Sequence, residues 1–438
     1  MTPLKVLISG NGVAGPALAY WLSLTGAKIT LIERSRALRL GGQQIDIRTP
    51  QAIELVKRMG ILERIRAAGV NELGMQLVDR NGRSTAFFPV APKGSRAQSF
   101  TSEFEIMRGE LVRILNGLTD NNRNVKRRFG VSMESFTQDS ESNPQGKVHV
   151  KFDNGREEKF DLVVGADGIG SKTREAMLGP TYDVSDLRRQ LGGYVGYFSV
   201  PSDPEKDEYK ATFCHLPGSR VIGSRKDCDE LLRVYILLRG ENSALDAALK
   251  SGDQAQLKCA IAGLYQSDAW QCNRFLEALP AADDLYCTRI EQVWLPEGRW
   301  SQGRVALLGD AAYGYTASGY GCALSLAGAY FLAGEIATSY KENKSSPTAA
   351  VMKGATNYEK KFRPIAAASQ NSSPWLDSML YPRTKIGIWV LHRLAERWAK
   401  VASNLNLHQA AGKDWQLPCY ELQKKKKKEV KRERSPLP

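Results

Sequence analysis

Three glycines near the N-terminus have a spacing with a defined chemical use. Gly10, Gly12 and Gly15 form a GxGxxG pattern between the apolar run 6–8 and a helix-like segment. In such a pattern the first glycine permits a tight turn, the second lets backbone amides approach a pyrophosphate, and the third lets the helix pack closely on the strand. The start of that helix favours an anion through its free N–H groups and its dipole. The pattern therefore predicts a dinucleotide site, and an ordinary glycine-rich turn is the alternative.

A carboxylate narrows the choice of dinucleotide. Glu33 ends the second apolar run, 29–32, where an acidic side chain accepts hydrogen bonds from the hydroxyls of an adenosine ribose. It would repel a 2′-phosphate about 4 Å away by roughly 4 kcal/mol at an effective dielectric of about 20. The residue therefore favours NAD or FAD over NADP at this site.

Two more acidic motifs, Asp167-Gly168 and Gly309-Asp310, each follow an apolar, strand-like segment. The carboxyl end of a parallel strand faces the crevice of an open α/β sheet. A carboxylate there does not favour a phosphate, so we expect Asp310 to accept hydrogen bonds from a polyol, with the amides of Gly319 and Gly321 nearby. FAD has a ribityl chain in addition to its ribose, whereas NAD has only its riboses. The motifs together therefore favour FAD.

Helices and strands must position these residues, and the apolar periodicity and turn signals predict where they lie. The strand-rich part of the chain lies between about 183 and 290. The apolar stripe of the segment 385–405 is expected to pack in a core. The expected helices are 50–59, 63–68, the later part of 105–118, the helical interval 242–278, a long helix ending near 340, and 385–405. The expected strands are 75–79, 84–88, 148–152, 159–164, 193–200, 209–216, 220–224, 231–238 and 305–308.

This order predicts an α/β fold: a Rossmann-like FAD-binding domain with an inserted antiparallel β-sheet substrate domain and C-terminal helices. The expected parts are 1–182, the first part of the FAD-binding domain; 183–290, the β-rich substrate domain; 291–365, the return of the FAD-binding domain; 366–420, a C-terminal helical region; and 421–438, a basic disordered tail.

Composition excludes several classes of protein. Of the net charge of +14, six charges come from residues 424–434, where eight basic residues outnumber two acidic ones. Without that segment the chain is only mildly basic, so we expect no nucleic-acid partner; the segment itself suits a solvated tail, a nuclear address or a weak contact with an anionic membrane. The chain has no apolar stretch that is both long enough and sufficiently free of charges to predict a transmembrane span. The seven scattered cysteines suit reduced thiols in the cytoplasm, and the four separated histidines predict no metal site.

With these motifs in order, roughly residues 4–365 resemble the single-component FAD-dependent monooxygenases of the aromatic-hydroxylase type, including members that modify polyketides and tetracycline. The resemblance implies that the GxGxxG glycines and Glu33 hold the ADP half of non-covalent FAD. Asp46 and Arg108 would contact the flavin cofactor, and Arg34 is also expected to be a cofactor-binding residue. Arg39 is a candidate for the NADPH phosphates, with a plain surface role equally open.

The remaining motifs have implied roles as well. Asp167-Gly168 would serve FAD and a passing nicotinamide nucleotide, and Asp310 would bind the ribityl hydroxyls. The chain departs from the family at Tyr313 and Ala317, where members often carry His and Pro. The resemblance implies that both positions belong to the loop beside the flavin ring.

The resemblance also implies a reaction. NADPH or NADH would reduce FAD, and O₂ would form a C4a-hydroperoxyflavin. One oxygen atom would then enter an electron-rich phenolic, enolic or polyketide-like molecule, in secondary metabolism. No protein nucleophile is needed. Tyr194, His215 and Tyr235 are candidates to touch the substrate, although a core position is favoured for each. Two alternatives stay open: an FAD-dependent dehydrogenase or reductase on the same fold, and a non-enzymatic flavin-binding interaction protein.

Overall fold

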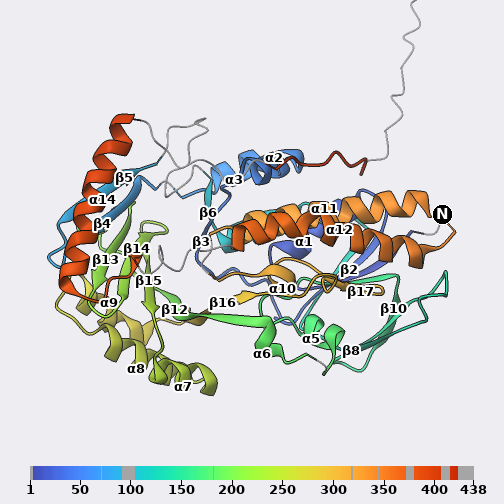
Figure 1. Ribbon diagram of the computed structural model, residues 1–438, viewed down its shortest axis with the longest axis horizontal. Coiled ribbons are helices and arrows are strands. Elements are labelled where there is room, and N and C mark those ends of the chain that lie inside the picture. The colour runs from blue at the N-terminus through green and yellow to red at the C-terminus, as the bar shows by residue number, and fades with distance from the viewer. Residues whose placement is uncertain are drawn as a thin grey trace, which may run out of the picture.

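The computed structural model describes residues 3–70, 72–90, 104–180, 182–316, 319–343, 345–370, 379–405 and 415–422. Two large sheets dominate the molecule, one at each end of its long axis (Figure 1). The predicted tail falls almost entirely outside the described residues, and so does Ala317.

The first sheet is the predicted parallel sheet. It has six strands in the order β17-β18-β11-β1-β2-β7, and all neighbours are parallel except β17 and β18. The strands are β1 (Lys5–Ser9), β2 (Lys28–Glu33), β7 (Val125–Phe129), β11 (Leu162–Gly165), β17 (Ser301–Gln302) and β18 (Val305–Leu307). The three predicted motifs therefore follow three neighbouring strands of one sheet, β1, β11 and β18, and β2, which ends in Glu33, lies on the other side of β1.

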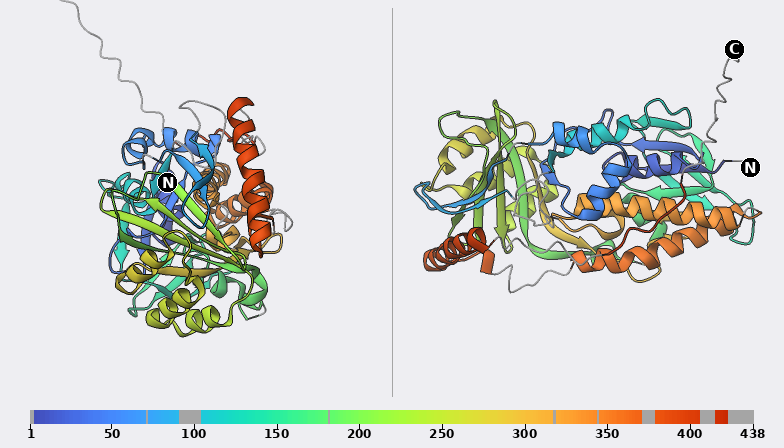
Figure 2. Two further views of the ribbon diagram at one scale, coloured as in Figure 1. Left: turned by 90° about the vertical axis from the view of Figure 1, so that its left-hand side faces the viewer. Right: turned by 90° about the horizontal axis from the view of Figure 1, so that it is seen from above.

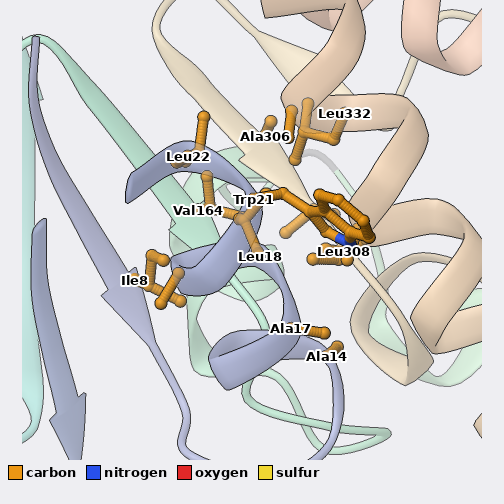
Figure 3. Packing of buried hydrophobic residues seen from close by; sticks show 14 of the residues in the cluster. Ile8, Ala14, Ala17, Leu18, Trp21, Leu22, Val164, Ala306, Leu308 and Leu332 are labelled. Atoms are coloured by element: carbon orange, nitrogen blue, oxygen red, sulfur yellow. The ribbon is translucent and has the colours of Figure 1, made fainter. Parts of the chain in front are cut away.

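Helices cover one face of this sheet because their small and apolar residues match its buried strands. Figure 3 shows Leu18 and Trp21 of α1 (Ala14–Ser23) between Ile8 and Val164 of the sheet and Leu332 of a long helix. That helix is α11 (Gly321–Glu342), and α12 (Pro347–Gln370) packs beside it. Among the described helices α11 alone is long and apolar enough to span a bilayer, and it is mostly buried inside the protein.

A smaller three-stranded sheet and α5 (Lys172–Leu178) lie on the opposite side of the six-stranded sheet (Figure 1). Its strands are β8 (Met133–Gln138), β9 (Val148–Phe152) and β10 (Glu157–Phe160). The prediction of one strand over 159–164 was wrong: the chain breaks at Asp161, so that β10 completes the hairpin and β11 joins the parallel sheet. Asp161 occupies the break because its carboxylate accepts hydrogen bonds from the Lys5 backbone, at 2.7 Å, and from the Lys147 ammonium.

The second sheet has seven strands in the order β16-β12-β15-β14-β13-β4-β5. They are β4 (Gly74–Val78), β5 (Ser84–Pro89), β12 (Arg188–Pro201), β13 (Ala211–Leu216), β14 (Arg220–Lys226), β15 (Leu231–Arg239) and β16 (Tyr286–Val293). The sequence placed β4 and β5 with the first 182 residues, yet β4 pairs with β13 in parallel. The expected boundaries therefore divide this sheet, because that pairing joins segments far apart in the chain.

Each face of the second sheet has a different cover. One face packs on α7 (Ser243–Ser251), α8 (Gln254–Tyr265) and α9 (Cys272–Ala278), and forms a core with inward side chains such as Phe198 and Ile236. On the opposite face, α14 (Lys385–Leu405) covers the end formed by β13, β4 and β5. The β12, β15 and β16 end of that face is not covered by α14.

Short elements connect the two sheets. A two-stranded ribbon of β3 (Gln44–Asp46) and β6 (Glu105–Met107) leads into α4 (Arg108–Gly117), as expected for an extended segment followed by a helix. The other short elements are α2 (Pro50–Arg58), α3 (Leu62–Ala67), α6 (Val184–Leu187), the 3₁₀ turn η1 (Leu279–Ala281) and α10 (Asp310–Tyr313).

Residues 415–422 form neither helix nor strand, so residues 415–420 of the predicted C-terminal helical region are not helical. This segment lies along the helical layer, where the Tyr330 hydroxyl donates to the Pro418 carbonyl at 2.9 Å and Gln51 donates to the Trp415 carbonyl at 2.6 Å. The Tyr420 ring lies against Gly334, where a Cβ would come within 2.1 Å of it. Glycine at that position therefore leaves space for the end of the chain.

Candidate cofactor and active site

The GxGxxG turn takes a conformation that only glycine fits. Gly10 has a φ of 111°, and a Cβ on it would lie 2.3 Å from the Ala166 carbonyl oxygen. A Cβ on Gly15 would lie 2.0 Å from the Gly10 carbonyl oxygen. The turn therefore packs directly against the segment before Asp167-Gly168, so the first two motifs form one unit at the carboxyl ends of β1 and β11.

Glu33 closes this turn from the side of β2. Its buried carboxylate accepts hydrogen bonds from the backbone N–H groups of Asn11, at 3.1 Å, and Ser35, at 3.0 Å. Arg39 reaches the same carboxylate, with Nε 3.8 Å from Oε1, while Arg34 is exposed beside it. The structure therefore brings Glu33 and Arg39 to the turn, whereas Arg34 faces solvent.

Asn11 is a candidate site residue that the sequence analysis missed. Its side chain is 5% exposed, and neither its amide nitrogen nor its amide oxygen has a hydrogen-bond partner. Such a pair of buried polar atoms costs free energy unless a bound group satisfies it. The signal in the sequence was a polar residue between the first two glycines of the motif.

The Asp167-Gly168 turn has a clear local role. The Asp167 carboxylate accepts hydrogen bonds from the Ser171 hydroxyl, at 2.5 Å, and from the Thr173 N–H and hydroxyl, at 3.0 and 2.9 Å. It thereby fixes the start of α5. Fully buried Arg174 then donates to the Ala311 carbonyl at 3.0 Å, which ties this motif to the one around Asp310.

Arg108 lies at the centre of the predicted site. Its side chain packs over Gly42, where a Cβ would lie 3.0 Å from the arginine Cδ, and its guanidinium is next to Gly12. Burial lowers the pKa of Arg108 and the nearby charge of Arg39 lowers it further, while Tyr197, Asp310 and Glu33 act in the opposite direction. One guanidinium therefore lies within electrostatic range of the first motif, the third motif and the second sheet.

Asp310 begins α10 after a sharp turn at Gly309, which has a φ of 65°. A Cβ on Gly321, at the start of α11, would lie 3.8 Å from its Oδ1. Burial raises the pKa of Asp310, and Arg108 opposes that shift. The third motif therefore places a carboxylate between a helix start and a guanidinium, which suits binding of hydroxyl groups.

Asp46 lies close by, at the end of β3. Its buried carboxylate accepts a hydrogen bond from Arg48 Nε at 2.5 Å. Arg48 in turn extends toward Gly319, where a Cβ would lie 3.9 Å from its Cζ. The charge of Asp46 also contributes to raising the pKa of Cys322, although burial is the larger cause and raises that pKa to about 12. The structure therefore brings Asp46 to the start of α11.

We infer a cleft between the two sheets from the burial of six side chains. They are surrounded by protein at depth, yet each keeps surface that water reaches: Arg108, Tyr197, Tyr235, Tyr286, Asp310 and Cys322. The glycine turn and two carboxylates border the same region: Gly12 lies next to Arg108, Asp310 interacts electrostatically with Arg108, and Asp46 with Cys322. This set fits FAD: backbone amides for a diphosphate, and acids for a polyol.

Three tyrosines form a row on the second sheet. Tyr197 of β12 is paired in register with Tyr286 of β16 on one side and with Tyr235 of β15 on the other. The Tyr197 and Tyr286 rings stack with centroids 5.3 Å apart. Arg108 interacts electrostatically with Tyr197, and Asp310 with Tyr286, so the row faces the cofactor residues. The sequence analysis named only Tyr235 from this row.

The other two substrate candidates do not face this cleft. The Tyr194 hydroxyl donates to Asp246 Oδ1 at 2.6 Å on the face that packs against α7. His215 Nδ1 lies 3.1 Å from His392 Nε2, under α14. Tyr194 therefore has the core position that the sequence analysis favoured, whereas His215 is half-buried beneath the helix.

Tyr313, which departs from the family pattern, points into the core. It is 3% exposed and packs on Trp300 and Phe362 with ring centroids 4.8 and 5.4 Å apart. Gly328 of α11 makes room for it, since a Cβ there would lie 2.0 Å from the Tyr313 hydroxyl. The substitution therefore fills the core beneath the loop and places no side chain in the cleft.

His215 of β13 and His392 of α14, which meet where the helix packs on the sheet, predict a loss of stability in acid. A neutral chain of hydrogen bonds can run from the Thr85 hydroxyl through His392 and His215 to the Leu380 carbonyl, with successive distances of 2.9, 3.1 and 3.1 Å. Burial and the neighbouring His392 lower the pKa of His215 to about 4, and burial lowers that of His392, which Asp79 opposes. The unfolded chain therefore binds more protons below about pH 6.5.

We expect the free energy of unfolding to fall by about 2 kcal/mol from this pair as the pH drops from about 6.5 toward 4. Urea unfolding at neutral and acid pH measures it, with His392→Gln as the variant because glutamine can still donate and accept. His149→Gln is the control, since His149 lies beside Asp139 on β9 of the three-stranded sheet. An equal acid loss in wild type and His392→Gln would contradict the assignment.

Comparison with known proteins agrees with this geometry. A family model described as an FAD binding domain matches residues 3–191. The flavin-dependent monooxygenase eupH of Phoma sp is 41% identical over 402 residues, which cover 90% of this chain and 92% of that protein. The FAD-dependent monooxygenase asL4 of Sarocladium schorii is 36% identical over 440 residues, covering 96% and 99%. The crystal structure of tetracycline destructase Tet(51) matches with a TM-score of 0.71 and 27% identity, covering 96% of this chain and 99% of that one.

The chain therefore belongs to the FAD-dependent monooxygenases, and FAD is its cofactor. The predicted fold class and family are confirmed. The relatives decide against the two alternatives, a reductase on the same fold and a non-enzymatic flavin-binding protein. As a monooxygenase, the protein uses O₂ and a substrate.

Proposed function

We propose that this monooxygenase inserts one oxygen atom into a planar, electron-rich small molecule of phenolic, enolic or polyketide-like character. The observation that carries the proposal is the tyrosine row Tyr286–Tyr197–Tyr235, which faces Arg108 and Asp310 across the cleft. Stacked aromatic rings offer flat apolar faces, and these bind flat conjugated molecules. A nicotinamide nucleotide, NADPH or NADH, is the proposed reductant, and a cytoplasmic role in secondary metabolism is the proposed setting.

Residues of the first sheet and of the short elements beside it would hold the cofactor. The turn at Gly10–Gly12, with the Asn11 amide, would bind the diphosphate, and Glu33 the adenosine ribose. Asp310 and Asp46 would bind hydroxyl groups, and Arg108 would lie beside the ring system. When bound, FAD supplies the redox chemistry: it accepts a hydride equivalent from the nucleotide and activates dioxygen toward the substrate.

The residues of the second sheet would orient the substrate and exclude water. Burial raises the pKa of Tyr197 to about 12 and raises that of Tyr235, so both phenols stay protonated at neutral pH and can donate to a substrate oxygen. Tyr235 already accepts a hydrogen bond from the Gln44 backbone at 3.4 Å, which fixes its hydroxyl above β3. Arg39 is exposed at the turn beside Glu33 and remains the candidate for the phosphates of the reductant.

The test of the reaction class is oxygen uptake by the FAD-loaded protein with NADPH or NADH and a panel of phenols, enolised diketones and anthraquinones. We expect nucleotide oxidation to rise with an accepted compound and one ¹⁸O atom from ¹⁸O₂ to appear in the product. Turnover of the same compound without oxygen, at an unchanged rate, would contradict oxygen insertion.

The tyrosine row predicts a specific loss of substrate affinity. Tyr286→Ala removes the exposed ring of the stacked pair, and a lost aromatic contact of about 1–2 kcal/mol corresponds to a KM higher by roughly tenfold. Tyr286→Phe keeps the ring and should keep most of the affinity. Tyr209→Ala is the control, because its hydroxyl donates to Asp229 at the surface. Steady-state kinetics with an accepted substrate measure all three, and an unchanged KM in Tyr286→Ala would place the substrate elsewhere.

A further inference from the structure

An apolar ridge runs along the outside of α14. Most of the exposed large apolar side chains among the described residues lie between 379 and 401. Four of them, Ile386, Val390, Leu394 and Trp398, follow one another at intervals of four residues, and Ile386 is 76% exposed. Residues at this spacing lie on neighbouring turns of one helix side. The sequence analysis expected such a stripe to be core, and for this side of the helix that expectation was wrong.

The opposite side of the same helix is fixed to the protein. Leu391 and His392 are buried, and Ala395 and Ala399 pack against the small core of Leu77, Ala86 and Phe88. In Figure 1 and in both views of Figure 2, α14 stands at the edge of the molecule, and no described helix or strand lies outside it. The ridge therefore points away from the protein while the helix itself is held by the sheet.

Basic side chains accompany the ridge. Residues 379–401 contain a single acidic residue, Glu396, which pairs with Arg393 at 3.1 Å and with Lys400 at 2.8 Å. Trp389 is 60% exposed and carries the Arg393 guanidinium 5.7 Å from its ring centroid. The basic residues of the segment are Arg383, Lys385, Arg393, Arg397 and Lys400. At 100° per residue, Trp389, Lys385, Arg393 and Lys400 fall on one flank of the ridge.

The apolar ridge and its basic flank together decide which kind of partner α14 can bind. A second copy of the chain would bring the cations of two α14 helices together with one acid on each, so like charges would oppose self-association. An anionic bilayer offers what the helix has: negative headgroups for the basic flank, an acyl boundary for the ridge, and an interface suited to tryptophan. We propose that α14 is a surface-binding helix that holds the enzyme on anionic membranes. The proposal does not depend on the substrate.

Vesicle co-sedimentation of the full-length, FAD-loaded protein tests this. We expect binding to vesicles of phosphatidylcholine with phosphatidylserine, weaker binding at high salt, and little binding to phosphatidylcholine alone. Ile386→Gln together with Leu394→Gln should weaken binding at least about tenfold, because two apolar side chains no longer enter the boundary. Leu231→Gln, at a side chain 42% exposed on β15, is the matched control and should bind like wild type. FAD content and the melting temperature confirm that each variant is folded.

Three results would overturn the proposal. Wild-type protein that binds neither kind of vesicle excludes a membrane helix. Binding that survives in the double variant, and disappears when Lys424–Lys428 are changed to glutamine, assigns the contact to the basic tail. A sedimentation coefficient that falls in the double variant without lipid assigns the ridge to self-association.

Discussion

Asp310→Ala is expected to yield a folded protein that purifies with little or no FAD. The carboxylate lies between the start of α11 and the field of Arg108, and accepting hydroxyl hydrogen bonds is the role that its position supports. Hydrogen bonds to a charged group contribute about 1.5–3 kcal/mol each, so losing two would weaken FAD binding by a factor of about 100 or more. Titration of the deflavinated protein with FAD, followed by quenching of flavin fluorescence, measures the affinity.

The same variant also shows whether FAD is lost because a hydrogen-bond acceptor is missing or because the protein is misfolded. Burial raises the pKa of Asp310, so its charge is costly in the protein without cofactor. We expect deflavinated Asp310→Ala to melt no lower than deflavinated wild type. Asp120→Ala, at a side chain 62% exposed, is the control and should bind FAD normally. Wild-type affinity for FAD in Asp310→Ala would contradict the role given to this carboxylate.

Gly15→Ala is expected to have the second large effect, and to act through the fold. The added methyl would lie 2.0 Å from the Gly10 carbonyl oxygen, so α1 and the turn must move apart. Overpacking of this kind costs about 1–3 kcal/mol or more, and it displaces the amides that would hold the diphosphate. We expect a lower melting temperature together with a loss of FAD, measured by thermal unfolding and the absorption spectrum.

Gly263→Ala provides the matched comparison for that change. Gly263 lies within α8, where an added Cβ meets nothing within 4 Å. Alanine is the better helix former by about 1 kcal/mol, so this variant should be as stable as wild type or slightly more stable. A Gly15→Ala protein that melts and binds FAD like Gly263→Ala would contradict the close packing of the turn.

The local motifs could be predicted because each residue acts on its immediate neighbours in the chain. Gly10 and Gly15 fit a turn of a few residues, Glu33 follows a buried strand, and the Asn-Gly pair at residue 81 marks the β4–β5 hairpin. Such patterns fix an element and its ends. They also place Asp310 at the carboxyl end of β18, because a parallel strand order follows from the alternation of strand and helix.

The features that were missed depend on contacts between distant segments. The β4–β5 hairpin joins the second sheet through pairing with β13, more than a hundred residues later. The tyrosine row exists only through the register of three strands, which hydrophobic alternation alone does not specify. Arg174 looks like a helix residue in the sequence, whereas its guanidinium binds the Ala311 carbonyl far along the chain.

Crystals of the wild-type protein grown with FAD would test the central claim most directly. That claim is that three separated motifs and the tyrosine row enclose one FAD. The account predicts electron density for the diphosphate at the turn of Gly10 and Gly12, and for the flavin ring in the cleft between Arg108 and the tyrosine row. Ordered FAD bound outside this cleft, or a correctly folded protein that is colourless after excess FAD has been added and the unbound FAD removed, would contradict it.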